Sequence, residues 1–237
     1  ASRFLNVPVK GLYETSVMYG GAKMGAQLVA LDEQLGAFRV DSVRNLSDRH
    51  GTEAPPIYET IRLNSTKTQD FLVDGCRFLS PKGDGAKLVV RSPPSWGGTL
   101  ITVFCAAEAK DHALAVLAKA HRRSQELNFL KGEAFTLSGE FLTREPASFD
   151  DVFLAPAVVD PITRTVKLLN TQGKAMDSRG LILMGPPGTG KTLVARTIMH
   201  ECKDATFIWL SSRDFSRMGM FGGIETAYDL AAENAPS

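Results

Sequence analysis

One eight-residue segment limits the possible folds of this chain more than any other. Residues 185–192 read Gly-Pro-Pro-Gly-Thr-Gly-Lys-Thr and match the pattern G-x-x-x-x-G-K-[S/T] of a phosphate-binding loop. The apolar run 181–184 precedes the loop and predicts a buried strand, and residues 193–199 follow it with helical character. A strand, a glycine-rich turn and a helix in this order are typical of a parallel α/β sheet that binds its ligand at the carboxyl ends of the strands.

The residue types in this loop suit a nucleotide phosphate. Glycines let successive backbone N–H groups turn towards an anion, and the helix that follows adds its positive N-terminal end. We expect Lys191, the candidate catalytic residue, to reach the β- and γ-phosphates, and the Thr192 hydroxyl to ligate Mg²⁺. The alternative, a glycine-rich turn that fits the pattern by chance, does not explain the flanking strand and helix. The candidate nucleotide contacts are Gly185, Pro187, Gly188, Thr189, Gly190, Lys191, Thr192 and Leu193.

Composition excludes several other classes of function. With 237 residues, 43% of them hydrophobic and 22% charged, the chain has the composition of an ordinary globular protein with one large domain or two small ones. The net charge of +1 gives no bulk electrostatic reason to expect a nucleic-acid partner. No apolar stretch has the length needed to span a bilayer, so we expect no membrane partner.

Cysteine and histidine usage points away from disulfides and zinc. The three cysteines (Cys76, Cys105 and Cys202) are odd in number and far apart, as expected of buried small hydrophobes in a reducing compartment. The four histidines show no zinc-type spacing, so no metal site on Cys or His is expected. A cytoplasmic location is the resulting prediction.

The chain divides by pattern into two domains, 1–145 and 146–237. In the first, short β-like runs alternate with turns rich in glycine and proline, and a helix follows at 107–125. Cations at the end of that helix suggest either a nucleic-acid contact or, in our preferred interpretation, a solvated face suited to a helix C-terminus. The predicted strands are 27–31, 37–43, 57–63, 71–79, 87–91 and 99–106.

The second domain shows β/α order. A hairpin at 133–137 and 140–143 and a boundary at 144–148 come before it. The predicted elements are a helix at 161–170, a strand at 180–184, a helix at 193–202, a strand at 206–210 and a helix at 224–233. The predicted fold class is therefore α/β: a mixed α/β domain at the N-terminus, followed by a parallel-sheet P-loop NTPase domain.

The stretch 148–237 resembles the AAA family of ATPases, which are hexameric protein-remodelling motors. Residues 180–192, Gly-Leu-Ile-Leu-Met-Gly-Pro-Pro-Gly-Thr-Gly-Lys-Thr, are nearly the standard string of that family. The double proline with Thr189 favours AAA over kinases or small GTPases. The entry Ser-Phe-Asp-Asp-Val at 148–152 is similar to the segment before the first AAA helix, which implies that Asp151 and Val152 contact adenine. The resemblance implies ATP or ADP and Mg²⁺ as ligands.

Residues 218–223, Met-Gly-Met-Phe-Gly-Gly, are similar to the first pore loop of the family. A short loop with Phe221 between glycines could grip an extended polypeptide by nonspecific apolar contact. The candidate pore-loop residues are Met220, Phe221 and Gly222. The alternative is that Met218, Met220 and Phe221 pack under a neighbouring helix.

The ending Ala-Pro-Ser at 235–237 is similar to the segment that immediately precedes the Walker B strand in this family. We therefore expect an ATPase core truncated before Walker B, without the arginine finger, so that ATP hydrolysis belongs to a longer parent protein. The order of the helix at 107–125, the hairpin and the entry at Phe149 is similar to the layout of the mitochondrial Rieske-protein translocase branch of AAA.

Three hypotheses follow for function. The leading one is an ATP-driven remodeller that assembles with itself as a homo-hexamer, with an N-terminal domain that selects a protein client. The second is a nucleotide-dependent switch or assembly module that threads nothing. The third, a nucleic-acid loader, needs a basic channel, and Arg213 and Arg217 are the only cations near the pore segment.

Overall fold

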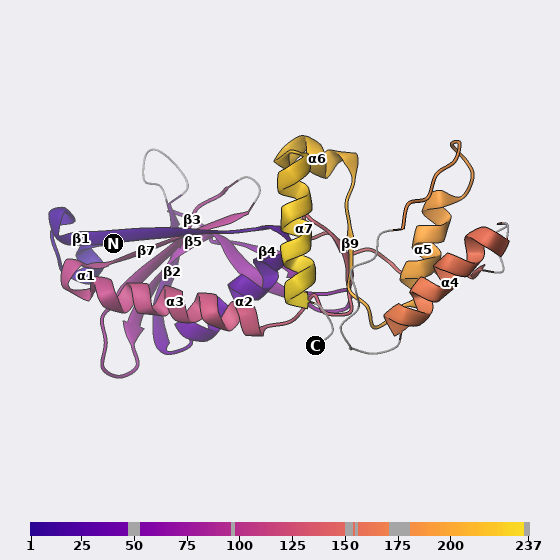
Figure 1. Cartoon of the computed structure of the whole chain (residues 1–237). Helices are drawn as coiled ribbons and strands as arrows, with labels where there is room; N and C mark the ends of the chain where they lie inside the picture. The colour runs from indigo at the N-terminus through magenta and orange to yellow at the C-terminus, as the bar shows by residue number, and fades with distance from the viewer. Residues whose placement is uncertain (47–52, 96–97, 150–153, 155, 171–180, 235–237) are drawn as a thin grey trace. The chain divides into compact units, whose positions relative to one another are not determined.

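The chain folds into two compact units. The computed structural model describes residues 1–46, 53–95, 98–149, 154, 156–170 and 181–234 (Figure 1). One unit covers Ala1–Phe129 and the other Leu130–Ser237. The units divide earlier than the predicted domain boundary at 145/146, because the segment after Leu130 pairs with a strand of the second unit.

The first unit is built on an antiparallel sheet. Seven of the described strands form it, in the order β1-β7-β6-β5-β2-β3, with β4 paired to β5. The long strand β5 organises the sheet, because it pairs with β2, β4 and β6. The strands are β1 Leu12–Tyr19, β2 Phe38–Leu46, β3 Glu53–Ala54, β4 Ile57–Arg62, β5 Thr68–Pro81, β6 Leu88–Ser92 and β7 Thr99–Ala106.

Two helices of this unit, α2 and α3, pack against each other and cover one face of the sheet (Figure 1). Five of the six predicted strands are confirmed as β2, β4, β5, β6 and β7, and the helix predicted at 107–125 is confirmed as η3 followed by α3. The helices are α1 Ser2–Leu5, η1 Val9–Gly11, η2 Gly21–Lys23, α2 Met24–Leu35, η3 Ala107–Ala109 and α3 Lys110–Glu126.

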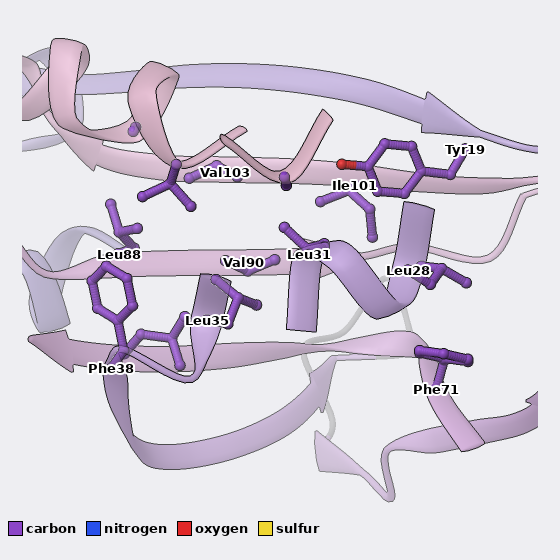
Figure 2. Packing of buried hydrophobic residues seen from close by; sticks show 14 of the residues in the cluster. Tyr19, Leu28, Leu31, Leu35, Phe38, Phe71, Leu88, Val90, Ile101 and Val103 are labelled. Carbon is purple, nitrogen blue, oxygen red and sulfur yellow. The ribbon is translucent and has the colours of Figure 1, made fainter. Parts of the chain in front are cut away.

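The strand predicted at 27–31 is wrong, because these residues lie within helix α2. Leu28, Leu31 and Leu35 recur at helical spacing, and all three are buried. Figure 2 shows them in one cluster with the strand residues Val90 and Ile101, in a core that α2, α3 and the sheet share. A short apolar run fits either a strand or a helix, and the burial of one helical face explains why this run is a helix.

Two cations of α3, one at each end of the helix, are engaged in ion pairs and a ring contact. Arg123 bonds to Glu33 of α2, with Nε to Oε2 at 2.7 Å, and to Glu126 at 3.1 Å. Lys110, at the other end of the helix, lies 5.3 Å from the centroid of the Tyr13 ring. These contacts engage Arg123 and Lys110 within the first unit, and the preference for a solvated face over a nucleic-acid contact stays a prediction.

The second unit contains a parallel strand pair and four helices among its described residues. β8 and β9 pair in parallel, with Ala134 opposite Phe207 and Thr136 opposite Trp209. The predicted hairpin is present as a tight turn, in which Phe135 forms an antiparallel bridge with Phe141. The fold class predicted from the sequence, α/β, is confirmed. The elements are β8 Ala134–Thr136, α4 Pro156–Asn170, α5 Lys191–Glu201, β9 Phe207–Trp209, α6 Ser212–Met218 and α7 Met220–Asn234.

The strand predicted at 180–184 is wrong for its described part. Residues 181–184 have no regular secondary structure, and the side chains of Ile182 and Met184 are 84% and 89% exposed. A strand needs a neighbour to satisfy its backbone N–H and C=O groups, and no described strand pairs with this segment. The approach to the loop is therefore irregular and open to solvent.

Among the described residues, no helix is both long enough and apolar enough to cross a membrane.

Candidate nucleotide-binding site

The candidate site is the turn between residue 185 and the first residues of α5. Three of its glycines have positive φ values: 154° at Gly185, 81° at Gly188 and 81° at Gly190. This region of backbone conformation is strained for residues with a Cβ atom, so the turn depends on glycine at these positions. Gly190 is also the N-cap of α5, which begins at Lys191.

Lys191 folds back over the turn that precedes it. Its ammonium donates to the carbonyl oxygens of Gly185 at 2.8 Å and Pro186 at 2.6 Å, and to Thr189 Oγ1 at 3.2 Å. Thr189 Oγ1 in turn donates to the Pro186 carbonyl at 2.9 Å. The carbonyl oxygens of the loop therefore hold the Lys191 ammonium, and a phosphate group could replace them as its acceptors.

The loop is open to solvent. Residues 185–189 are exposed, and so are Thr192 and Leu193 in the first turn of α5. The amides of this first turn have no partner within the helix, because the first N–H groups of any α-helix lack an i−4 carbonyl. Together with the positive end of the helix dipole, they give this end of α5 the properties of an anion site.

One face of α5 is buried within the second unit. Val194, Thr197 and Met199 are the buried residues of the helix. Thr197 Oγ1 donates to the Leu193 carbonyl at 2.9 Å, so this hydroxyl is satisfied without a partner outside the helix. Just beyond the helix, Cys202 packs in a small cluster with Val166 of α4.

Arg144 binds the C-terminal end of α5. Its Nη1 donates to the carbonyls of Met199 and Cys202, both at 2.7 Å. Its Nη2 donates to the carbonyls of Gly132 at 2.8 Å and Ala205 at 2.7 Å. One guanidinium thus connects the last turn of α5, its C-cap, the approach to β9 and the approach to β8.

Four backbone carbonyls and an aromatic ring surround the Arg144 guanidinium. The guanidinium lies 5.2 Å from the centroid of the Phe207 ring. Its burial lowers the pKa of Arg144, and the negative charges of Glu133 and Asp204 oppose this shift. Burial also raises the pKa of the Cys202 thiol, although the nearby guanidinium partly offsets that effect. A cation at this end of a helix is favourable, because the C-terminal carbonyls carry partial negative charge.

The candidate pore-loop residues lie on a helix rather than in a loop. α6 ends at Met218, Gly219 follows with φ of 74°, and α7 begins at Met220. The side chains of Met220 and Phe221 are 62% and 85% exposed. The alternative interpretation, packing under a neighbouring helix, is therefore wrong for these two residues.

Of the remaining predicted site residues, one lies in the first turn of α7 and two lie outside the described part of the chain. Gly222, the third pore-loop candidate, lies in the first turn of α7, where its carbonyl accepts a hydrogen bond from Thr226 Oγ1 at 2.8 Å. The candidate adenine contacts, Asp151 and Val152, lie outside the described residues. The functional roles of all these residues stay predictions.

Comparison with known protein families decides what kind of loop this is. The family model described as "ATPase family associated with various cellular activities (AAA)" matches residues 181–236, a segment that contains the loop, α5, β9, α6 and α7. This segment is therefore similar to the AAA ATPases. The resemblance inferred from residues 180–192 is thereby confirmed.

Curated relatives match parts of the chain at low to moderate identity. The chain is 38% identical over 101 residues to the ATP-dependent zinc metalloprotease FtsH 1 of Petrotoga mobilis, which is 39% of this chain and 15% of the relative. It is 42% identical over 62 residues to the proteasome-activating nucleotidase of Methanothermobacter thermautotrophicus, or 25% of this chain and 15% of the relative.

A third relative is the mouse vacuolar protein sorting-associated protein 4B. It is 37% identical over 68 residues, which is 27% of this chain and 15% of the relative. The matched part therefore spans about one seventh of the length of these relatives.

The sequence predicts the phosphate loop but not the contacts of Arg144 with α5. In the sequence, Arg144 is only the first residue of the predicted domain boundary at 144–148. Most of its partners, from Met199 to Ala205, lie more than fifty residues away in the sequence. A single arginine before a glutamate and a proline carries no local signal for such a role.

Proposed function

We propose that this chain binds ATP or ADP with Mg²⁺ through residues 185–192 and forms part of an AAA-type ATP hydrolase. The conformation of the loop carries the proposal: three glycines at positive φ lead into α5, and Lys191 lies against the turn. The AAA match over residues 181–236 supports the same conclusion independently.

The described residues fit a nucleotide phosphate. Around the Cβ positions of Gly188 and Gly190 there is no other atom within 4 Å, so the backbone is accessible at both positions. The amides at the start of α5 would donate to phosphate oxygens, and Lys191 would exchange its carbonyl contacts for the β- and γ-phosphates.

The hydroxyl of Thr192 is the group on this chain that would hold Mg²⁺. It is exposed in the first turn of α5, next to Lys191. The ion supplies positive charge that stabilises the charge developing on the phosphoryl oxygens.

We further propose that the parent protein acts on a protein client as a ring, a hexamer by family likeness. Two relatives are named as an ATP-dependent metalloprotease and a proteasome-activating nucleotidase, which favours a protein client. The exposure of Met220 and Phe221 supports a contact with such a client. The first unit would select the client or promote assembly, and the location would be the cytoplasm.

Titration with ADP tests the nucleotide site. We expect Lys191→Ala to weaken binding at least about ten-fold, because a charge-assisted hydrogen bond contributes roughly 1.5–3 kcal/mol. Lys203→Ala is the matched control, since Lys203 is an exposed lysine just beyond the other end of α5. Equal affinity of the wild type and Lys191→Ala would show that the proposal is wrong.

A second experiment separates threading from switching. In the parent protein, Phe221→Ala should abolish ATP-dependent unfolding of a tagged client while it leaves ADP affinity unchanged, because Phe221 is exposed and lies outside the phosphate loop. Unchanged remodelling by this variant would favour the switch. Salt-sensitive binding of DNA or RNA would instead favour the nucleic-acid loader.

A further inference from the structure

Helix α5 has its two ends in very different surroundings. At its N-terminal end, residues 185–189 are exposed, and the Lys191 ammonium donates to the carbonyls of its own loop. At its C-terminal end, Arg144 holds Met199 and Cys202 by their carbonyls. The polar attachment of this helix to the rest of the unit is therefore concentrated at the end away from the loop.

Arg144 is too far from the loop to touch a nucleotide. α5 has eleven residues, which corresponds to roughly 16 Å between its ends. The helix is a rigid connection over that length, and its first-turn amides are the groups that would receive the phosphates. A tilt or a shift of the C-terminal end would therefore move these amides.

We infer that Arg144 is a positioning residue of the nucleotide site: by binding the C-terminal carbonyls of α5, it sets where the helix presents its N-terminal amides. This inference rests on the proposed function, that the loop binds a nucleotide. It assigns to Arg144 a role in ligand affinity in addition to its contribution to stability.

The shape of the guanidinium explains why an arginine serves here. Its planar fork directs Nη1 to two carbonyls of α5 and its C-cap, and directs Nη2 to Gly132 and Ala205. A lysine ammonium has three donors on one atom and cannot reproduce this arrangement. The clamp therefore fixes α5 relative to two segments at once, the approaches to β8 and β9.

Affinity for ADP in the full chain tests the inference. We expect Arg144→Met to raise the Kd for ADP roughly ten-fold, less than the hundred-fold that a misplacement of about 1 Å costs a reacting geometry. Arg144→Lys should show a smaller increase, because it keeps the charge and part of the hydrogen bonding. All titrations are made at a temperature at which circular dichroism shows each variant to be folded.

Thr206→Val is the matched control. Thr206 Oγ1 accepts from the Gly132 amide at 2.9 Å and donates to the Asn234 carbonyl at 3.1 Å, so its loss weakens the same part of the unit without touching α5. We expect it to lower the melting temperature and to change the Kd for ADP by less than about two-fold.

Chemical rescue gives a readout that general destabilisation would not. Methylguanidinium should restore part of the ADP affinity of Arg144→Ala, and it should leave the affinity of the wild type and Thr206→Val unchanged. If wild type binds ADP and all folded Arg144 variants bind it equally well, the inference is wrong. If methylguanidinium fails to restore affinity to a weakened Arg144→Ala, the inference is also wrong. If wild type itself does not bind ADP, the proposed function has failed instead.

Discussion

Replacement of Arg144 by methionine should destabilise the second unit strongly. A hydrogen bond to a charged group contributes roughly 1.5–3 kcal/mol, so the four bonds of Arg144 would sum to about 6–12 kcal/mol. The net effect is smaller, because the desolvation of the guanidinium opposes it and the site is only half-buried, so water can reach some of the freed carbonyls. We expect a loss of about 2–4 kcal/mol in the free energy of unfolding.

Urea unfolding followed by the fluorescence of Trp209 measures this loss. Trp209 lies in β9, the strand that follows Ala205, whose carbonyl accepts from Arg144. The chain has two tryptophans, so a Trp96→Phe background isolates the signal. The slope of the free energy against urea should stay constant while the midpoint falls.

Arg196→Met is the control for this prediction. Arg196 lies on α5 and pairs with Glu145 at 3.7 Å, but both side chains are more than half exposed. An exposed ion pair contributes less than about 1 kcal/mol, so this variant should unfold close to the wild-type midpoint. A loss below about 1 kcal/mol for Arg144→Met, or equal losses for both variants, would refute the clamp.

Three further predictions concern single positions. Gly190→Ala should weaken ADP binding, because φ at Gly190 is 81° and this backbone conformation is strained for alanine. A Cβ would meet no atom within 4 Å at Gly190 or at Gly83, but Gly83 lacks the positive φ. ADP titration of Gly190→Ala and of the control Gly83→Ala measures the effect. Gly98→Ala should destabilise the first unit by about 1–3 kcal/mol, because its Cβ would lie 2.4 Å from the Tyr19 carbonyl oxygen; thermal unfolding measures it. The hydrogen bond from Ser80 is the main cause that lowers the pKa of Asp41, so this pair stabilises the fold above the ordinary carboxyl pKa, and the gain is lost as the pH falls through the lowered value. Ser80→Ala should therefore reduce the dependence of stability on pH below the ordinary carboxyl pKa.

Local patterns in the sequence were enough to predict the phosphate loop. Its glycines, Lys191 and Thr192 are consecutive, and the backbone conformation that they require is a property of the segment itself. The same holds for α3, whose buried residues recur at helical spacing. Where conformation depends on neighbours close in the sequence, the pattern was sufficient.

The errors arose where distant neighbours decide the structure. The run at 27–31 is apolar enough for a strand or a helix, and packing of α2 on the sheet decided in favour of the helix. β1 was not predicted, because its polar run 14–16 and Met18 interrupt any alternation, and its pairing with β7 is what makes it a strand. Residues 181–184 lack a described partner strand and are irregular for the converse reason.

The most direct test of the account is a titration of the ¹⁵N-labelled protein with ADP, followed by NMR of the assigned loop amides. Recognition of phosphate by the loop predicts the largest chemical-shift changes at Gly188, Gly190 and Lys191, and it predicts that adenosine, which has no phosphate, leaves these amides unchanged. Equal changes with adenosine, or changes with ADP that leave residues 185–192 unaffected, would contradict the central claim that this loop binds the phosphates.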